Sequence, residues 1–471
     1  MASPAAPHIV IFPFLAYGHL VPLLDLSKAF TQRNIKITII TTPGNVSFIH
    51  KHFSRNPQVH ITEIPFPITD DLPKGCENTA QLPSMAFYMH FLKATRKLQE
   101  PFHQILQHMS QSNNLPICVI SDFFLGWTLP ICHEFGVPRL VFHGMSVFGL
   151  ALSKTVWVHM PHLHVFSDTE PLNMPGLELP FTLTRLDVPE MLQTPDHNDP
   201  ISRLTAEDGQ SELDSWGVIV NSFLEIEEPY VPSLESFFVN GAKSWCVGPL
   251  ILYDPPTEPV EPEHPMILKF LADHAMPESV IYVAFGTQAD VSNSQLDEVA
   301  FGLEMSGHPF IWVVRSKNWS IPNGLEEGVK GRGLIMREWV DQRRVLAHRS
   351  TGGFLSHCGW NSVLESICEG IPVLAWPMMA DQFFNARLVV DGLGAGLSVA
   401  SVGPEEIVGR KAISECVIEL MGEEKGKNAR DRVKELSLVA RKAVQEGGSS
   451  YDNLSRLIDQ LGVSEPSLSM V

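Results

Sequence analysis

Short, nearly continuous apolar runs alternate with segments of helical periodicity along the chain. Residues 8–14 (HIVIFPF) and 35–42 (IKITIITT) have the composition of strands buried on both faces of a parallel sheet. Between them, residues 23–32 carry apolar side chains at helical spacing. Strand, helix and strand in this order predict a βαβ unit at the start of the chain, and further strands are predicted at 115–122 and 137–144.

A proline-rich, acidic stretch interrupts this pattern at residues 247–265 and has the composition of an exposed connector. Beyond it the alternation of strands and helices starts again. Strands are expected at 279–287, 309–315, 351–357 and 371–377, with helical segments between them. The chain is therefore predicted to form two doubly wound α/β domains.

The predicted organisation has four parts. Residues 1–246 form the N-terminal domain, 247–265 the linker and 266–450 the C-terminal domain; residues 451–471 form a helix and tail expected to pack back on the N-terminal domain. Ligands of open parallel sheets bind at the carboxyl ends of the strands. The residues at those ends are therefore the candidates for function.

Composition and charge exclude several classes of protein. Hydrophobic residues make up 44% of the 471 residues, which is enough for substantial cores, and the net charge of −19 argues against binding to nucleic acid or to anionic lipid. Seven cysteines without a C-x-x-C pair suggest reduced thiols. The N-terminus has neither the basic region of a signal peptide nor an apolar run long enough for a membrane span. A cytoplasmic protein, expected to be a monomer, is predicted.

The stretch SHCGWNS at residues 356–362 combines chemically useful side chains at a predicted strand end. A metal site is disfavoured because His357 and Cys358 are adjacent, diverge, and have no second pair at ligand spacing. A thiol nucleophile is disfavoured because Cys358 would point away from His357 if the strand continued. A purely structural corner stays open as an alternative.

A phosphate site fits this corner better. Gly359 allows a sharp turn, and Asn361 and Ser362 then stand at the start of a helix, where free N–H groups and the helix dipole favour an anion. His357 can donate one more hydrogen bond to a phosphate oxygen. Glu365 lies about one turn further along, placed to accept from ribose hydroxyls.

The longer span from Trp339 to Gln382 resembles the signature box of plant family-1 UDP-dependent glycosyltransferases. The matching positions are Trp339, Gln342, Leu346, His348, Gly352, Phe354, residues 357–362, Glu365, residues 370–372, Pro377, Asp381 and Gln382. The stretches PFLAYGHLVPLLDL, VIVNSFLEIE, WCVGPL and YVAFGT resemble other landmarks of the family. The resemblance covers nearly the whole chain. It implies the GT-B fold, with two Rossmann-like domains facing across a cleft, and inverting transfer of a sugar from a UDP-sugar to a small acceptor.

Three positions depart from the family pattern. Asp341 stands where the box usually has proline, which places a negative charge near an anionic ligand. Tyr17 stands where the family usually has glutamine. Gly144 stands where a threonine often contacts the sugar, so that contact is not expected here.

The resemblance implies that His19 is the base that takes the proton of the acceptor hydroxyl. His19 follows the first strand at the start of a helix, whose positive end favours a neutral imidazole. Asp122 ends another strand of the same domain and would orient the ring. Spacing alone leaves open that both residues only cap local structure.

The chain contains no D-x-D pair of the kind that holds a metal on a departing nucleotide, so no metal or other cofactor is expected. The final glutamine of the box implies UDP-glucose as the donor. The resemblance assigns the binding of the UDP-sugar to twelve residues: Thr287, Trp339, Val340, Gln342, His357, Gly359, Trp360, Asn361, Ser362, Glu365, Asp381 and Gln382. Trp339 is expected to stack on uracil, and Trp360, Asp381 and Gln382 to face the sugar.

Aromatic and methionine-rich stretches of the first domain predict an apolar acceptor such as a flavonoid or another phenolic. The candidate pocket residues are Phe14, Phe87, Phe91, Phe124, His143 and Met145. C-glycosylation of an activated aromatic carbon and O-glucosylation of a terpenoid or hormone stay open. A dinucleotide-dependent oxidoreductase is disfavoured because AYGHLVP is not G-x-G-x-x-G, and a UDP-binding sensor because it would not require a base.

Overall fold

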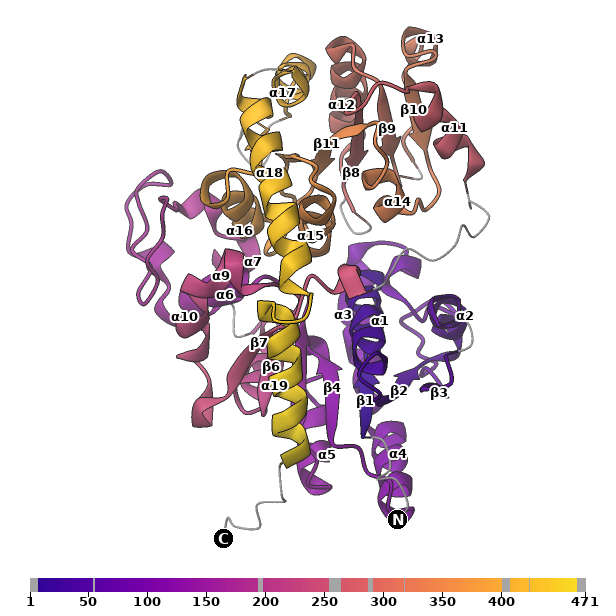
Figure 1. Ribbon diagram of the computed structural model, residues 1–471, viewed down its shortest axis with the longest axis vertical. Helices are drawn as coiled ribbons and strands as arrows, with labels where there is room; N and C mark the ends of the chain where they lie inside the picture. The colour runs from indigo at the N-terminus through magenta and orange to yellow at the C-terminus, as the bar shows by residue number, and fades with distance from the viewer. Residues whose placement is uncertain are drawn as a thin grey trace. The chain divides into compact units, whose positions relative to one another are not determined.

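The computed structural model describes residues 7–53, 56–193, 198–253, 264–286, 291–316, 318–399, 407–422 and 424–463. It contains two parallel β-sheets, each flanked by helices (Figure 1). The prediction of two doubly wound α/β domains is confirmed. None of the helices in these ranges combines the length and the apolarity that a membrane span requires.

The first sheet has seven strands in the order β3-β2-β1-β4-β5-β6-β7. Their bounds are β1 (His8–Phe12), β2 (Lys36–Thr41), β3 (Val59–Glu63), β4 (Cys118–Asp122), β5 (Arg139–His143), β6 (Gly217–Val220) and β7 (Lys243–Cys246). All neighbouring pairs are parallel. The strand order reverses between β1 and β4, and this reversal is where ligands of such sheets bind.

The second sheet has six strands in the order β10-β9-β8-β11-β12-β13. Their bounds are β8 (Val280–Ala284), β9 (Phe310–Val313), β10 (Gly333–Met336), β11 (Thr351–Ser356), β12 (Val373–Ala375) and β13 (Gly396–Ser398). These neighbours also pair in parallel. The same reversal occurs between β8 and β11, so the second sheet has an equivalent switch point.

Helices connect most of the strands and cover the sheets. In the N-terminal half they are α1 (Tyr17–Thr31), α2 (Pro43–His52), α3 (Tyr88–Arg96), α4 (Gln99–Gln111), α5 (Thr128–Glu134), α6 (Val147–His159), α7 (Glu190–Gln193), α8 (Pro200–Leu213), α9 (Leu224–Glu227) and α10 (Val231–Glu235). The others are α11 (Pro265–Asp273), α12 (Asn293–Ser306), α13 (Leu325–Gly328), α14 (Gln342–Leu346), α15 (Trp360–Glu369), α16 (Gln382–Arg387), α17 (Arg410–Gly422), α18 (Glu424–Ala443) and α19 (Ser449–Val463).

Contacts between residues divide the chain into two units. The first comprises Met1–Lys154, Thr194–Pro255 and Ala443–Val471, and the second comprises Thr155–Gln193 and Pro256–Lys442. This grouping places residues 155–193 with the second unit, whereas the predicted ranges kept them in the first domain. Most of the predicted linker, residues 254–263, lies outside the described residues.

The C-terminal helix α19 belongs to the first unit and packs on β7 and α9. Asn453 Nδ2 donates to the Cys246 carbonyl oxygen at 3.0 Å, and the Ser450 hydroxyl donates to the carbonyl of Gly248. Ser449 Oγ donates to Glu225 Oε2 at 2.8 Å. Figure 1 shows α19, in yellow, alongside β7. The segment WCVGPL therefore has a structural role, because its carbonyl groups bind α19.

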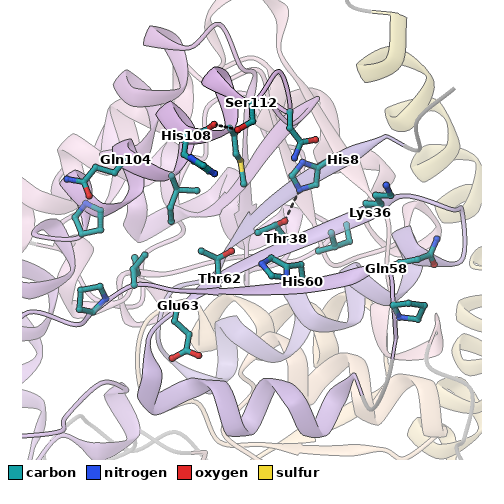
Figure 2. A pocket seen from close by; sticks show the side chains of 18 residues that line it. His8, Lys36, Thr38, Gln58, His60, Thr62, Glu63, Gln104, His108 and Ser112 are labelled. Atoms are coloured by element: carbon teal, nitrogen blue, oxygen red, sulfur yellow. Dashed lines mark hydrogen bonds between the residues drawn. The ribbon is translucent and has the colours of Figure 1, made fainter.

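A hollow of about 700 Å³ lies in the first unit between α4 and the edge strand β3 (Figure 2). His8, His60 and His108 contribute to its lining, and His8 Nε2 bonds with Thr38 Oγ1 at 2.8 Å. His8 and Lys36 are the first residues of their strands. The hollow therefore borders the amino ends of β1 and β2, opposite the strand ends at which the candidate residues were predicted.

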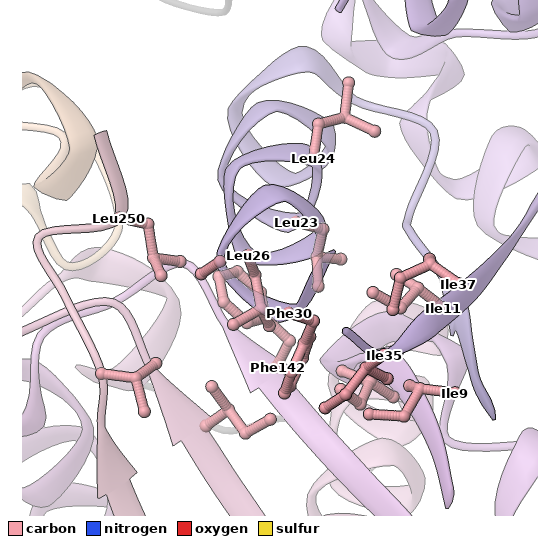
Figure 3. Packing of buried hydrophobic residues seen from close by; sticks show 14 of the residues in the cluster. Ile9, Ile11, Leu23, Leu24, Leu26, Phe30, Ile35, Ile37, Phe142 and Leu250 are labelled. Carbon is pink, nitrogen blue, oxygen red and sulfur yellow. The ribbon is translucent and has the colours of Figure 1, made fainter. Parts of the chain in front are cut away.

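The first sheet is buried on both faces, which explains why its central strands are continuously apolar. Ile9 and Ile11 of β1 pack in one cluster with α1, including Leu23 (Figure 3). Val10 and Phe12 point to the opposite face and pack in a second cluster. Successive strand residues point to opposite faces, so a strand covered on both sides needs apolar residues at every position.

Candidate active site

The switch point of the first sheet brings a histidine and a carboxylate together. His19 lies in the first turn of α1, directly after β1, and Asp122 is the last residue of β4. Because β1 and β4 are parallel neighbours, their carboxyl ends meet at one edge of the sheet. His19 Nδ1 and Asp122 Oδ2 are 2.8 Å apart.

The environment of this pair fixes which atom can do chemistry. Asp122 is fully buried, while the side chain of His19 is 28% exposed. An ionised carboxylate only accepts, so Nδ1 carries the shared proton and Nε2 is the nitrogen that can take another. Asp122 Oδ1 also accepts the N–H of Phe124 at 3.1 Å, which orients the carboxylate at the start of the turn Phe123–Leu125.

Aromatic rings surround His19 on the side of α3 and the turn Phe123–Leu125. Phe14 and Phe124 lie 5.5 and 5.6 Å from the imidazole, centroid to centroid, and 5.0 Å from each other. Phe91 packs edge-on against Phe14 at 5.9 Å. Phe14 and Phe124 are thus brought beside the imidazole, whereas Phe91 contacts Phe14 and, like Phe14, is fully buried.

Tyr88 is a member of this cluster that the sequence analysis missed. Its ring lies 6.5 Å from Phe14 and 6.3 Å from Phe124. Burial raises the pKa of its phenol, an effect reinforced by the charge of Asp122, so the hydroxyl stays protonated. Tyr88 and Phe91 are three residues apart on α3, and this helical spacing within SMAFYMHFL was the available signal.

The other predicted acceptor residues have different settings. Phe87 precedes α3 and lies 6.3 Å from the ring of His90. His143 is buried, with Nε2 3.4 Å from Glu212 Oε2, and Lys154 Nζ donates to the same oxygen at 2.7 Å. The ring of His143 therefore faces a buried ion pair. Met145 is partly exposed between β5 and α6.

In the second unit, the HCGWNS corner joins β11 to α15. Gly359 precedes the first residue of α15, so Asn361 and Ser362 fall in the first helical turn as predicted. The first N–H groups of a helix have no partner within it and attract anions. The chain turns at Cys358, whose φ is +62°, and not at Gly359 as predicted, because the φ of −58° at Gly359 is one that any residue adopts.

His357 lies between two glycines. A Cβ at Gly286 or Gly359 would come within 2.7 and 2.6 Å of Nε2, so neither position has room for a side chain unless the ring moves. Burial lowers the pKa of His357 to about 4, although a hydrogen bond with the Ala284 backbone opposes the shift. The imidazole is therefore neutral at physiological pH, and its single N–H is the donor of that bond to the Ala284 backbone.

Gln342 connects the loop after β10 to α15. Its Nε2 donates to Ser362 Oγ at 2.9 Å and to Glu365 Oε2 at 2.6 Å. Ser362 accepts this bond and so keeps its own proton for donation. Asp341, which stands in place of the usual proline, caps α14 by accepting the N–H of Arg344 at 3.4 Å. The unexpected acidic residue thus has a local structural partner.

The two tryptophans of the predicted donor site differ in exposure. Trp339 is 47% exposed, and its carbonyl oxygen accepts from His264 Nε2 at 2.7 Å. Val340 is buried. Trp360 is only 2% exposed, so its side chain is part of the packing rather than an open surface. Thr287 lies outside the described residues.

Asp381 and Gln382 stand at the start of α16 and are both held by neighbours. Gln382 Oε1 accepts the N–H groups of Met378 and Met379 at 2.9 and 3.0 Å, which leaves its amide nitrogen as the donor. Asn385, which the sequence analysis missed, donates to Asp381 Oδ2 at 2.7 Å and to the Cys358 carbonyl at 3.0 Å. This asparagine ties the loop before α16 to the HCGWNS corner.

Neither constellation borders the hollow of Figure 2, since none of the predicted site residues is in its lining. Across the described ranges, no group of three or more His, Cys, Asp or Glu side chains is arranged to hold a metal ion. The candidate sites are therefore the His19–Asp122 pair with its aromatic neighbours, and the corner between β11 and α15.

Comparison with known proteins identifies the family. The profile described as "UDP-glucoronosyl and UDP-glucosyl transferase" matches residues 260–413. Scopoletin glucosyltransferase of Nicotiana tabacum is 38% identical over 96% of this chain and 98% of its own length. UDP-glycosyltransferase 90A1 of Arabidopsis thaliana is 39% identical over 98% and 97%. The chain is a plant family-1 UDP-glycosyltransferase.

Solved structures of other plant glycosyltransferases agree with this family assignment. UGT73P12 of Glycyrrhiza uralensis, complexed with glycyrrhetinic acid 3-O-monoglucuronide, has a TM-score of 0.86 at 32% identity and covers 97% of this chain and 96% of its own. UGT2 of Phytolacca americana, complexed with UDP-2fluoro-glucose and pterostilbene, has a TM-score of 0.80 at 28% identity, covering 97% and 100%. The glycosyltransferase therefore has the GT-B fold and is a UDP-dependent hexosyltransferase acting on small acceptors.

Proposed function

We propose that this glycosyltransferase transfers glucose from UDP-glucose to a hydroxyl of a small phenolic acceptor, with inversion and with His19 as base. The observation that carries the proposal is the 2.8 Å bond between His19 Nδ1 and Asp122 Oδ2 beside the ring cluster. Aromatic walls suit a flat apolar acceptor whose reacting hydroxyl is presented to Nε2. The Asp122 carboxylate alone is sufficient to orient the imidazole of His19, which is the proposed base.

In the proposed reaction, Nε2 takes the proton of the acceptor hydroxyl as its oxygen attacks the anomeric carbon. The bond between that carbon and the phosphate oxygen breaks, and UDP departs with the electron pair. Asp122 stabilises the imidazolium that forms, as the carboxylate of a catalytic triad does. The proton passes only to the imidazole of His19, so the Asp122 carboxylate does not take up a proton during the reaction.

The departing UDP carries charge that the second unit is suited to receive. The N–H groups in the first turn of α15 and the hydroxyl of Ser362 are donors suited to this charge. The exposed indole of Trp339 is suited to stacking on uracil. Glu365 accepts from Gln342 through Oε2 and from Arg343 through Oε1, and its carboxylate is the group proposed to accept from ribose hydroxyls.

The phenolic class of acceptor is supported by relatives. Anthocyanin 3'-O-beta-glucosyltransferase of Gentiana triflora is 37% identical, and UDP-glucose flavonoid 3-O-glucosyltransferase 7 of Fragaria ananassa is 36% identical. Both names specify an oxygen-linked glucose on an aromatic compound. The same linkage is proposed for this chain.

A matrix of UDP-sugars and acceptors tests the proposal. UDP-glucose, UDP-galactose and UDP-xylose are each combined with flavonoid, coumarin, triterpenoid and hormone acceptors, and kcat/KM is measured for every pair. The highest value is expected for UDP-glucose with a flavonoid or coumarin. Mild acid hydrolysis of the product should release the aglycone; an acid-stable product would show C-glycosylation instead.

A further inference from the structure

Arg139, the first residue of β5, is almost completely buried inside the first unit, with 1% of its surface exposed. A buried guanidinium is unfavourable unless its N–H groups and its charge are matched. In this structure the N–H groups of Arg139 have hydrogen-bond acceptors, and its charge has carboxylates nearby. The positions of its partners indicate what the residue does for the reaction.

The hydrogen bonds of Arg139 extend in two directions. Nη1 donates to Ser215 Oγ at 2.9 Å, on the side of α8. Nε donates to Ser121 Oγ at 2.8 Å, and Nη2 donates to the main-chain carbonyl of Asp122 at 3.2 Å. Ser121 and Asp122 are the last two residues of β4. The guanidinium therefore holds the strand end that carries the orienting carboxylate.

A directed chain of hydroxyls strengthens this attachment. Thr128 Oγ1 donates to the carbonyl of Leu125 at 2.7 Å, so its single proton is used. Ser121 Oγ, 2.8 Å from Thr128 Oγ1, must then be the donor in that pair. Ser121 thus accepts from Arg139 and donates to Thr128. The chain links β5, β4 and the turn that precedes α5.

Carboxylates balance the charge of the guanidinium. Asp208 and Glu212 are buried on α8, four residues apart, and both attract Arg139. Burial lowers the pKa of Arg139 to about 10, while Cys132, Asp208, Glu212 and Asp122 oppose the shift. The guanidinium consequently stays charged at neutral pH and attracts Asp122 electrostatically as well as through its main chain.

We propose that Arg139 is a positioning residue of the transfer reaction: it fixes the end of β4 and thereby holds the Asp122 carboxylate on Nδ1 of His19. The proposal rests on the proposed role of His19 as base. Arg139 touches neither the imidazole nor a substrate, so its effect passes through Ser121 and Asp122. Because misplacing a reactive group by about 1 Å can cost on the order of 10²-fold in rate, a distant support of this kind is measurable.

Two serines offer a matched pair of variants. Removing Arg139 itself would leave buried carboxylates unmatched and could prevent folding. Ser121→Ala and Ser215→Ala each remove one buried hydroxyl that accepts from the guanidinium, at 2.8 and 2.9 Å, but only Ser121 adjoins Asp122. Both variants should lose similar stability in urea. Only Ser121→Ala should affect the chemistry.

The readouts separate positioning from stability. Ser121→Ala is expected to lower kcat about tenfold with an unchanged KM for UDP-glucose, whereas Ser215→Ala stays within about twofold of wild type. The acidic limb of the kcat/KM profile should move to lower pH in Ser121→Ala, because a loosened Asp122 stabilises the imidazolium less. In an Asp122→Asn background, Ser121→Ala should have no further effect, since both changes act through one carboxylate.

Equal losses of kcat in Ser121→Ala and Ser215→Ala, or an undiminished effect of Ser121→Ala on top of Asp122→Asn, would overturn the inference. His19→Ala is measured alongside. If His19→Ala kept near-wild-type turnover, the base itself would be misassigned and the proposed function would fail. If His19→Ala were inactive while the two serine variants behaved alike, only the role of Arg139 would fall.

Discussion

At the scale of single residues, the function of this glycosyltransferase depends on how each polar side chain is held. Asp122 is held by the N–H of Phe124 while it contacts His19, and Gln382 is held by two N–H groups of its own loop. Asp122 uses Oδ1 to stay in place and Oδ2 to contact His19, while Gln382 uses Oε1 to stay in place and leaves its amide nitrogen as a donor. Single substitutions can separate these two uses.

His19→Ala is expected to lower kcat by about 10²–10⁴-fold, because the acceptor hydroxyl loses its base. UDP binding should be nearly unchanged, since the helix end and His357 belong to the other unit. Asp122→Asn should cost less than His19→Ala if Asp122 only orients the ring. Steady-state kinetics with a phenolic acceptor, together with calorimetric titration of UDP, measure both quantities. Near-wild-type turnover of His19→Ala would refute the mechanism.

Gln382 offers a sharper test of how the donor sugar is selected. Gln382→Glu keeps an oxygen for the N–H groups of Met378 and Met379 but loses the amide donor, whereas Gln382→His keeps one donor and one acceptor in a different geometry. Losing one hydrogen bond to a sugar hydroxyl costs about 1–3 kcal/mol, so kcat/KM for UDP-glucose should fall about 5- to 150-fold in both variants.

The ratio of kcat/KM for UDP-glucose to that for UDP-galactose should move toward galactose in Gln382→His. The melting temperature should drop only in this variant, because Gln382→Glu preserves the loop. A wild type that prefers galactose, or ratios unchanged in both variants, would show that Gln382 does not distinguish the 4-hydroxyl. UDP-xylose belongs in the same series, because Gly144 stands where a sugar-contacting hydroxyl is often found.

At the scale of secondary-structure elements, α8 is fixed by buried charge as well as by apolar packing. Asp208 is buried and 3.3 Å from Arg96 Nη2, and Glu212 accepts from Lys154. Burial raises the pKa of Asp208 to about 7, against the opposing charges of Arg96 and Arg139. The folded chain therefore binds a proton at pH values where the unfolded chain has released it.

This proton makes a signed contribution to stability. Between about pH 4 and pH 7 the folded state binds more protons at Asp208 than the unfolded state, so the free energy of unfolding falls as pH rises through that range. A change of about three pKa units corresponds to roughly 4 kcal/mol at most. Asp208→Asn should flatten the dependence, measured as urea unfolding at pH 5 and pH 8. An identical slope in the variant would contradict the shift.

The central elements were readable from sequence, and the peripheral ones were less so. The predicted strand at 8–14 is β1 (His8–Phe12), and the one at 115–122 is β4 (Cys118–Asp122), because strands covered on both faces are continuously apolar. The edge strand β3 (VHITE) is half exposed, and β13 has three residues, so neither has such a run. Short or edge strands give little periodic signal.

Only some residues of the candidate site could be predicted from a local sequence pattern. The HCGWNS corner could be predicted because a glycine and small polar residues follow a strand directly. Asn385 and Arg139 could not be assigned from local pattern, because each has a decisive partner that is distant in sequence: Asn385 bonds to Cys358, 27 residues earlier, and Arg139 to Ser121, 18 residues earlier. Such residues become informative only when the fold brings the segments together.

At the scale of the whole molecule, a chain with a net charge of −19 has to hold an anionic nucleotide through local groups. The donors proposed for it are the first turn of α15 and Ser362, and the sequence has no D-x-D pair. Transfer from UDP-glucose is therefore expected to continue in millimolar EDTA. Activity is measured over a chelator titration at fixed UDP-glucose. Complete loss, restored by Mn²⁺ or Mg²⁺, would mean that a metal meets the charge of UDP.

The return of α19 to the first unit constrains how this enzyme can be recombined with its relatives. An exchange of halves at a single crossover near residue 256 would graft a foreign C-terminal helix onto β7. The grafted helix would have to supply the equivalents of Ser450 and Asn453 for the carbonyls of Gly248 and Cys246. A chimera with two crossovers, the second near residue 443, keeps each helix with its native sheet and is the better route to exchanging donor specificity.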